Sequence, residues 1–253
     1  MKGAHSIAAV ILTIGDELLI GQTIDTNSAW MATVLNQAGI PVKRRVAVGD
    51  DWNAIWEALT AEGKAADIVL ITGVLGPTSD DITKPFLREY FGGKMVVHQP
   101  TLDHITYIFE QIHKRPMIDR NRKQAEVPDS CEVLFNETGT APGMLFKKNG
   151  AFIFSLPGVP HEMKWLTENK VIPYLQKQIL SSHVGHRTLL TAGIGESFLA
   201  EMILDFENNL PDTLKLAYLP NFGMVRLRLT GQGNDSHQLN TLLDHQFDLL
   251  KKA

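Results

Sequence analysis

The chain of 253 residues has a single cysteine, Cys131, and therefore cannot form an intrachain disulfide. Because this cysteine has no local partner motif, we interpret it as a buried structural thiol in a reducing compartment, and we expect a cytoplasmic protein. No apolar run reaches the roughly 18 residues of a membrane-spanning helix, and the N-terminus lacks the pattern of a signal peptide. We therefore expect no membrane partner.

The chain also lacks an excess of positive charge, with 24 Lys and Arg residues against 28 Asp and Glu residues and a net charge of −4. This balance argues against a protein that binds nucleic acid over a broad surface. The C-terminal part contains no Gly-x-x-Gly loop of the kind that clamps an RNA backbone. We expect a small-molecule partner and no nucleic acid.

Apolar runs and amphipathic segments alternate over the first two thirds of the sequence. This β-α-β order predicts an α/β fold with a mainly parallel sheet and helices on both faces, which gives three layers. The dipeptide Asn149-Gly150 predicts a hairpin between two apolar segments. The predicted strands are 8–14, 42–48, 68–71, 144–146 and 152–154, and the predicted helices include 27–38, the segments after 51, 83 and 160, and a long one at 101–125.

The pattern changes near residue 170, where strand, helix, two strands and helix follow one another. The expected strands are 188–194, 214–218 and 225–229, with helices at 196–210 and 238–251. A segment of this size suits a small α+β domain. We therefore predict two domains, 1–170 and 171–253.

The loop from Thr72 to Asp81 follows a buried strand and precedes a helix. Its glycines and hydroxyls would let backbone N–H groups approach an anion, and its two adjacent carboxylates would repel a phosphate unless a metal ion or a proton intervened. The alternative is an ordinary glycine turn in which Asp80 or Asp81 caps the next helix. Asp16 and Asp50 also lie just after predicted strands, so four acidic residues could meet at one edge of the sheet, although each alone could be a helix cap.

Several ordered motifs, spread almost end to end, make the resemblance specific. These segments are Thr13 to Gly21, Asp25 to Asn27, Thr72 to Thr83, Asn121 to Ala125, Gly139 to Gly143, Leu156 to Met163, Gly193 to Ser197 and Ala217 to Pro220. In them the sequence is similar to the competence/damage-inducible CinA family, whose first domain belongs to the molybdopterin-binding MogA/MoaB-like group and is followed by a KH-like module.

The resemblance implies metal-dependent hydrolysis of the pyrophosphate bond of ADP-ribose to AMP and ribose 5-phosphate. Asp81 and Asp50 match carboxylates implicated in catalysis and metal binding. The implied cofactor is a divalent ion, with Co, Ni, Mg and Mn all open, and potassium as an accessory; a homo-oligomer is also implied. The implied substrate- and phosphate-binding residues are Thr72, Gly73, Gly76, Thr78, Ser79, Asp80, Asp16, Glu17, Asn27, Gly139, Thr140, Pro157 and Gly158.

Two departures from the family pattern keep other functions open. Many members carry a further domain that deamidates nicotinamide mononucleotide, and no such segment follows here, so we predict no deamidase activity. Val74 replaces a loop glycine, and this substitution could weaken substrate binding. The alternatives are therefore an adenylyltransferase or pterin-binding protein of the molybdopterin type, and a catalytically weak regulatory binding protein.

Overall fold

The computed structural model describes residues 7–73, 83–178, 183–233 and 235–253. The chain divides into two compact units. The first unit comprises the residues up to Leu35 together with 41–175, and the second comprises 36–40 and 176–253. The boundary predicted after residue 170 falls within a continuous helical stretch, in which a π-helical turn, Thr167–Val171, leads into α8 (Ile172–Gln178).

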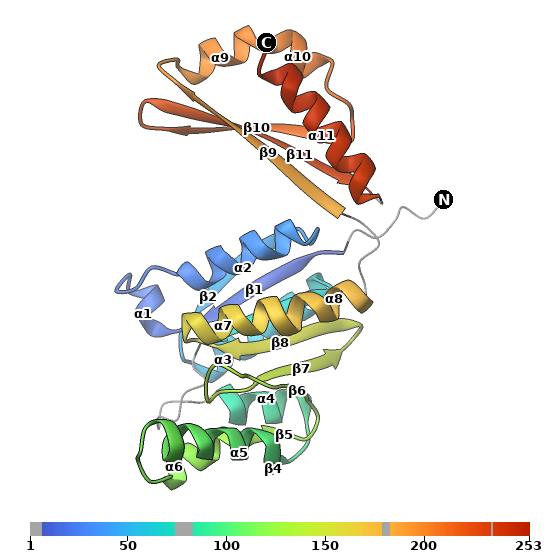
Figure 1. Cartoon of the computed structure of the whole chain (residues 1–253). Coiled ribbons are helices and arrows are strands. Elements are labelled where there is room, and N and C mark those ends of the chain that lie inside the picture. Colours follow the sequence, from blue (N-terminus) through green and yellow to red (C-terminus); the bar gives the residue numbers. More distant parts are fainter. Residues whose placement is uncertain (1–6, 74–82, 179–182, 234) are drawn as a thin grey trace. The chain divides into compact units, whose positions relative to one another are not determined.

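The first unit is built on a six-stranded sheet with the order β2-β1-β3-β8-β7-β6 (Figure 1). Neighbours are parallel from β2 to β8, whereas β7 is antiparallel to β8 and β6 is antiparallel to β7. The predicted mainly parallel sheet is confirmed. The strands are β1 (Ala9–Ile14), β2 (Val42–Val48), β3 (Ile68–Gly73), β6 (Glu132–Leu134), β7 (Gly143–Lys148) and β8 (Ala151–Pro157).

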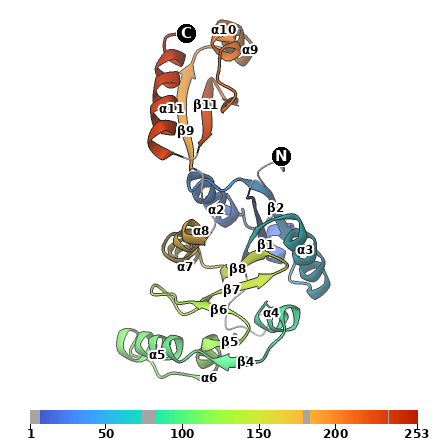
Figure 2. The same cartoon turned by 90° about the vertical axis from the view of Figure 1, so that its right-hand side faces the viewer.

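Helices cover both faces of this sheet, as Figure 2 shows. On one face lie α2 (Thr26–Gln37), α7 (Pro160–Leu166) and α8, and on the other lie α3 (Trp52–Ala65) and α4 (Thr83–Phe91). Every residue of β1 is buried, because apolar helix faces cover both of its sides. This double burial explains why β1 reads as a continuous apolar run in the sequence.

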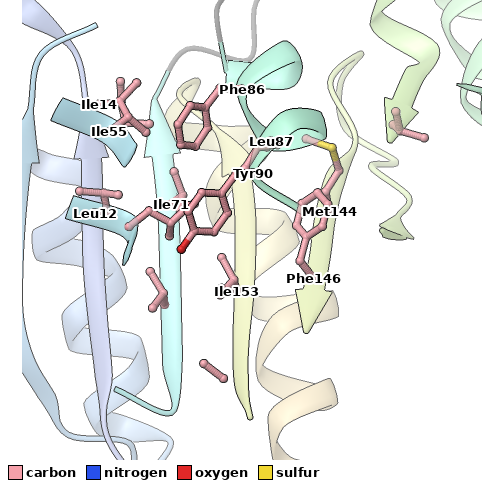
Figure 3. Close-up of a cluster of buried hydrophobic side chains, with 14 of the residues drawn as sticks. Leu12, Ile14, Ile55, Ile71, Phe86, Leu87, Tyr90, Met144, Phe146 and Ile153 are labelled. Carbon is pink, nitrogen blue, oxygen red and sulfur yellow. The ribbon is translucent and has the colours of Figure 1, made fainter. Parts of the chain in front are cut away.

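The core between the sheet and α3 and α4 combines aliphatic side chains with aromatic rings, which come from the helices and from β7 (Figure 3). Leu12 and Ile71 project from the sheet towards Phe86 and Tyr90 of α4. The Phe86 ring lies with its centroid 5.3 Å from that of Trp52 in an edge-to-face contact, a geometry that aromatic pairs prefer. This packing anchors α3 and α4 against the sheet.

The hairpin predicted at Asn149-Gly150 is confirmed. The two residues have φ values of 54° and 84°, and the flanking Lys148 and Ala151 pair across the strands. Two positive φ angles match the backbone twist of a two-residue hairpin turn, which explains the preference for Asn-Gly.

The single helix predicted at 101–125 is wrong. The structure has α5 (Gln99–Tyr107), a π-helical turn at Ile108–Ile112, an irregular segment, and only then α6 (Asp119–Arg122). Lys114 has a φ of 53°, and Pro116 follows two residues later. Both features break a helix. The segment that returns from α6 forms β5 (Glu126–Pro128), which pairs antiparallel with β4 (Met95–Val97), a two-stranded ribbon absent from the prediction.

The second unit is a three-stranded antiparallel sheet with the order β10-β11-β9, and the predicted small α+β unit is confirmed. Leu239 and Leu243 of its C-terminal helix pack on Leu227 and Leu229 of the central strand. The predicted helix 196–210 is divided at Ile203. The elements are β9 (His183–Ala192), α9 (Glu196–Met202), α10 (Leu204–Asn208), β10 (Leu214–Asn221), β11 (Met224–Gly233) and α11 (Ser236–Leu250).

Candidate functional site

The ends of β1 and β2 are joined by two acidic residues. The backbone N–H of Asp16, at the start of α1 (Asp16–Leu19), donates to Asp50 Oδ2 at 3.0 Å, and the N–H of Asp50 donates to Asp16 Oδ1 at 3.1 Å. A Cβ on Gly49 would lie 2.4 Å from Asp16 Oδ1, so this position accepts only glycine without a shift. The reciprocal pair therefore fixes both carboxylates at the carboxyl edge of the sheet.

One oxygen of this acidic pair has no partner. Asp50 Oδ1 is buried and accepts no hydrogen bond from the described residues. An unpaired buried carboxylate oxygen is costly unless a donor or a cation meets it. No cluster of three His, Cys, Asp or Glu side chains suited to a metal occurs within the described ranges. Magnesium-type sites, however, often use one or two carboxylates and complete their shell with substrate phosphates and water.

The ends of β3 and β8 approach each other closely through glycines. Gly73 has a φ of 150°, and a Cβ there would lie 2.4 Å from the carbonyl oxygen of Ile14. A Cβ on Gly158 would lie 2.7 Å from the carbonyl oxygen of Gly73. Beneath them, the buried Thr72 hydroxyl donates to the carbonyl of Pro157 at 2.9 Å. Packing alone therefore requires these two glycines, and the side chain of Thr72 is engaged in joining the two strands.

A cavity of about 460 Å³ opens beside these strand ends. Its lining surface is mostly apolar, with side chains such as Ile14, Leu18 and Val159, and nine residues contribute polar side chains. Such a lining suits a ligand with a flat apolar ring and several polar atoms. The polar side chains of the lining are Thr13, Glu17, Thr23, Asp25, Thr26, Asn27, Gln124, Thr140 and Glu162.

The first turn of α2 forms one wall of this cavity. Asp25 accepts hydrogen bonds from the Ser28 N–H at 2.9 Å and from the Thr13 hydroxyl at 2.8 Å, so it caps α2 and ties the helix to β1. The amide Nδ2 of Asn27 donates to the Gly158 carbonyl at 2.8 Å. These contacts hold the helix N-terminus against the ends of β1 and β8.

A buried carboxylate shapes the wall formed by residues 136–141. Glu162 Oε2 accepts from Asn136 Nδ2 at 2.6 Å and lies 3.4 Å from the Ala141 nitrogen. A Cβ on Gly139 would overlap this carboxyl group. Burial raises the pKa of Glu162, while the hydrogen bonds from Ala141 and Asn136 partly offset that effect. Glu162 therefore organises the loop that presents Thr140 to the cavity.

The predicted site residues fall into three groups. Glu17, Asn27, Gly73, Thr140, Pro157 and Gly158 line the cavity. Asp16, Asp50, Thr72 and Gly139 lie next to the lining without being part of it. The remaining positions, Gly76, Thr78, Ser79, Asp80 and Asp81, lie outside the described residues, as does Val74, the departure from the family pattern.

The polar lining residues that sequence reasoning missed include Asp25, Gln124 and Glu162. Each of these three lies within a segment that matches the family, so the signal was present in the motifs themselves. Gln124 and Glu162 come from short helical segments, and residue type alone gave no reason to select them.

Comparison with known proteins identifies the family of the chain. A family model described as a probable molybdopterin binding domain matches residues 10–177, and one described as the damage-inducible protein CinA KH domain matches residues 186–252. The chain belongs to the CinA-like family. A CinA-like protein of Flavobacterium psychrophilum is 48% identical over 96% of this chain, and one of Cytophaga hutchinsonii is 44% identical over the same share.

The chain spans 58% of the length of these two CinA-like relatives. A solved structure from Thermoplasma acidophilum, described as the protein CinA with unknown function, is 30% identical, covers 70% of this chain and all of its own, and has a TM-score of 0.59. None of the helices described here is long and apolar enough to cross a membrane.

Proposed function

We propose that the first unit hydrolyses the pyrophosphate bond of ADP-ribose, with a divalent metal ion, to give AMP and ribose 5-phosphate. The observation that carries this proposal is the unpaired buried oxygen of Asp50. It lies beside Asp16, whose neighbour Glu17 lines the cavity. A cation-accepting carboxylate next to a largely apolar cavity is the arrangement that a charged pyrophosphate joined to an adenosine requires.

The Asp50 oxygen fits a metal ion, and Asp50 with Asp81 would hold it. When bound, the ion would neutralise charge on the pyrophosphate and lower the barrier to attack on phosphorus. The hydrogen bond from the Asp16 N–H keeps the Asp50 carboxylate in a fixed orientation. Gly73 and Gly158 line the cavity at these strand ends, where close packing fixes their backbones.

Hydrolysis needs a base for the attacking water. The water oxygen forms a new bond to one phosphorus atom while the bridging P–O bond breaks, and the leaving phosphate departs with that electron pair. A carboxylate at this edge, Asp50 or Asp81, accepts the proton of the water. The products are AMP and ribose 5-phosphate whichever phosphorus is attacked.

Pterin binding is the second candidate, because the matching family model is described as a probable molybdopterin binding domain. The apolar lining would accept a pterin ring as readily as an adenine ring. An adenylyltransferase of this type acts on the same kind of phosphoanhydride joined to adenosine. Release of AMP from ADP-ribose without any pterin present distinguishes the hydrolase.

The test is to incubate the purified chain with ADP-ribose and each of Mg²⁺, Mn²⁺, Co²⁺ and Ni²⁺, with and without potassium, and to measure AMP by chromatography. We expect AMP from the intact protein and a rate lower by about 10²-fold or more in Asp50→Asn. This substitution keeps an oxygen that can accept the Asp16 N–H, so the fold should persist. Asp81→Ala should lose activity similarly.

Asp212→Asn serves as the matched control, since Asp212 is exposed in the second unit. Equal rates for Asp50→Asn, Asp212→Asn and the unchanged chain would show that the activity belongs to a contaminant or to another site. If no metal supports AMP release, Val74→Gly tests the remaining alternative, that the chain is a catalytically weak regulatory binding protein. A large gain in turnover would identify Val74 as the impairing residue.

A further inference from the structure

Two amide side chains of the cavity each carry a buried oxygen without a partner. Asn27 Oδ1 and Gln124 Oε1 accept no hydrogen bond from the described residues, although both side chains line the cavity. They belong to segments far apart in the sequence, the first turn of α2 and the helical turn Lys123–Ala125. Two unpaired acceptors brought to one cavity indicate a ligand that supplies hydrogen-bond donors.

The orientation of the Asn27 amide is fixed by its other end. Its Nδ2 donates to the Gly158 carbonyl at 2.8 Å, and a carbonyl can only accept. The atom left without a partner is therefore the oxygen, so this position offers an acceptor and not a donor. Asp25, which caps the helix two residues earlier, holds the whole turn in place.

The position of Gln124 is also fixed, by its burial and by a hydrogen bond to its backbone. Its side chain is 6% exposed, and its backbone carbonyl accepts a hydrogen bond from the buried Lys84 ammonium at 2.7 Å. The side chain therefore cannot move to bulk solvent without displacing the segment that carries it. Its side-chain amide oxygen is buried and accepts no hydrogen bond from the described residues.

A phosphate group cannot satisfy these oxygens, because its own oxygens are acceptors at neutral pH. Leaving a buried acceptor unpaired is costly, so a ligand that displaces water here must bring its own N–H or O–H groups. In a nucleotide, the uncharged donors are the ribose hydroxyls and the exocyclic amine of the base. The carboxylate of Asp25 in the same lining also disfavours an anion at this place.

We propose that Gln124 and Asn27 form an acceptor pair that binds the uncharged donor groups of the nucleotide and so directs the pyrophosphate away from α2. This inference rests on the proposed function, because it assigns which part of that substrate the pair contacts. Gln124 thereby becomes a specificity-determining residue of the site.

Calorimetric titration with AMP, 2′-deoxy-AMP, 3′-deoxy-AMP and purine riboside 5′-monophosphate tests the pair without relying on turnover. We expect the intact chain to bind AMP about tenfold more tightly than at least one analogue, the difference made by one hydrogen bond of about 1.4 kcal/mol. A preference against a deoxy analogue would assign the ribose, and one against the purine riboside analogue would assign the amine.

The decisive variant is Gln124→Met, which keeps the length of the side chain and removes its amide. It should abolish the preference against that analogue, whereas Gln124→Glu keeps acceptor oxygens and should retain it. Gln111→Met is the matched control, because Gln111 is exposed in the same unit, and it should behave like the intact chain. Unfolding monitored by tryptophan fluorescence verifies that each variant is folded.

The proposal is overturned if AMP does not bind, if the intact chain binds all four nucleotides equally, or if Gln124→Met keeps the full preference. These outcomes are separable from a failure of the proposed function. Nucleotide binding with the expected preference but without ADP-ribose hydrolysis would refute the hydrolase and leave the acceptor pair standing. Hydrolysis together with an unchanged preference in Gln124→Met would refute the pair alone.

Discussion

The two sheets of the molecule bury their strands in different ways. In the first unit, β1 is buried at all six positions, whereas β11 in the second unit alternates between exposed and buried residues over much of its length. The first sheet has helices on both faces, so its strand ends are the places where the chain leaves the core. The second sheet has one face packed on α11, and its strands carry polar residues such as Arg226 and Arg228 on the other side.

Two glycines at the strand ends of the first unit differ from two turn glycines of the second unit. Gly73 and Gly158 at the strand ends of the first unit lie against backbone atoms, while Gly193 and Gly223 in the second unit have open space where a side chain would be. Tight backbone approach therefore coincides with the candidate site. The comparison implies that equal substitutions should have unequal effects in the two units.

The largest difference is expected between Gly73→Ala and Gly223→Ala. The added methyl group at Gly73 would lie 2.4 Å from the Ile14 carbonyl oxygen at a φ of 150°, so we expect a loss of about 3 kcal/mol or more in the free energy of unfolding. Gly223→Ala meets no atom within 4 Å and has only the cost of a φ of 70°, about 1–2 kcal/mol.

Urea denaturation separates the two effects, because all four tryptophans lie in the first unit and their fluorescence reports its unfolding. Far-UV circular dichroism follows both units. Similar losses for the two alanine variants would mean that close packing at the strand ends is not what distinguishes the first unit.

A smaller contrast is expected between Thr72→Val and Thr191→Val. Each hydroxyl donates to a backbone carbonyl at 2.9 Å, that of Pro157 for Thr72 and that of Val225 for Thr191. Thr72 is fully buried, so its loss leaves a carbonyl without a partner and should cost about 1–3 kcal/mol. Thr191 is half-buried, water can replace its hydroxyl, and the cost should be a few tenths of a kcal/mol.

The same pair of variants separates two roles for Thr72. If Thr72 only joins β3 to β8, Thr72→Val should be less stable, while its KM for ADP-ribose should stay within about twofold of the unchanged chain. The KM is measured below the unfolding transition. A rise in KM of about tenfold, the equivalent of one lost hydrogen bond to substrate, would instead support the phosphate-binding role implied by the family resemblance.

The sequence predicted the fold well where local pattern and burial agree. The apolar runs before Gly15 and Gly73 gave β1 and β3, and Asn149-Gly150 gave the hairpin, because each signal depends on neighbouring residues. The long helix at 101–125 was wrong because the apolar spacing continued past Lys114, where the backbone turns out of the helix.

The candidate site was predictable in part for the same reason. Asp16 and Asp50 could be expected at one edge because parallel strands end there, and their mutual hydrogen bonds are local to that edge. Gln124 and Glu162 could not be selected, because their burial depends on segments such as α4 and residues 136–141 that fold against them. Residue type does not reveal which amide or carboxylate will be left without water.

The smallest expected effect concerns how the free energy of unfolding depends on pH. The contributions of Glu162 and Asp235 to this dependence should have opposite signs. Burial raises the pKa of Glu162, so the folded protein keeps this proton after the unfolded chain has released it. The free energy of unfolding should therefore fall as pH rises from about 4.3 towards the raised pKa. Glu162→Gln should remove this loss and gain stability relative to the unchanged chain over that window, as measured by urea denaturation followed by tryptophan fluorescence.

Asp235 should show the opposite trend in the second unit. Its carboxylate accepts hydrogen bonds from the N–H groups of Gln238 at 3.0 Å and His237 at 2.8 Å, and these lower its pKa. The stabilisation is then complete above about pH 3.9 and is lost as pH falls through the lowered value. In Asp235→Asn, stability measured by circular dichroism should depend less on pH at acid pH, with no other change in its pH dependence. If Glu162→Gln instead lost stability relative to the unchanged chain as pH rose above about 4.3, the buried carboxyl group would have to be stabilised as an anion, and Glu162 would then be a charged wall of the cavity.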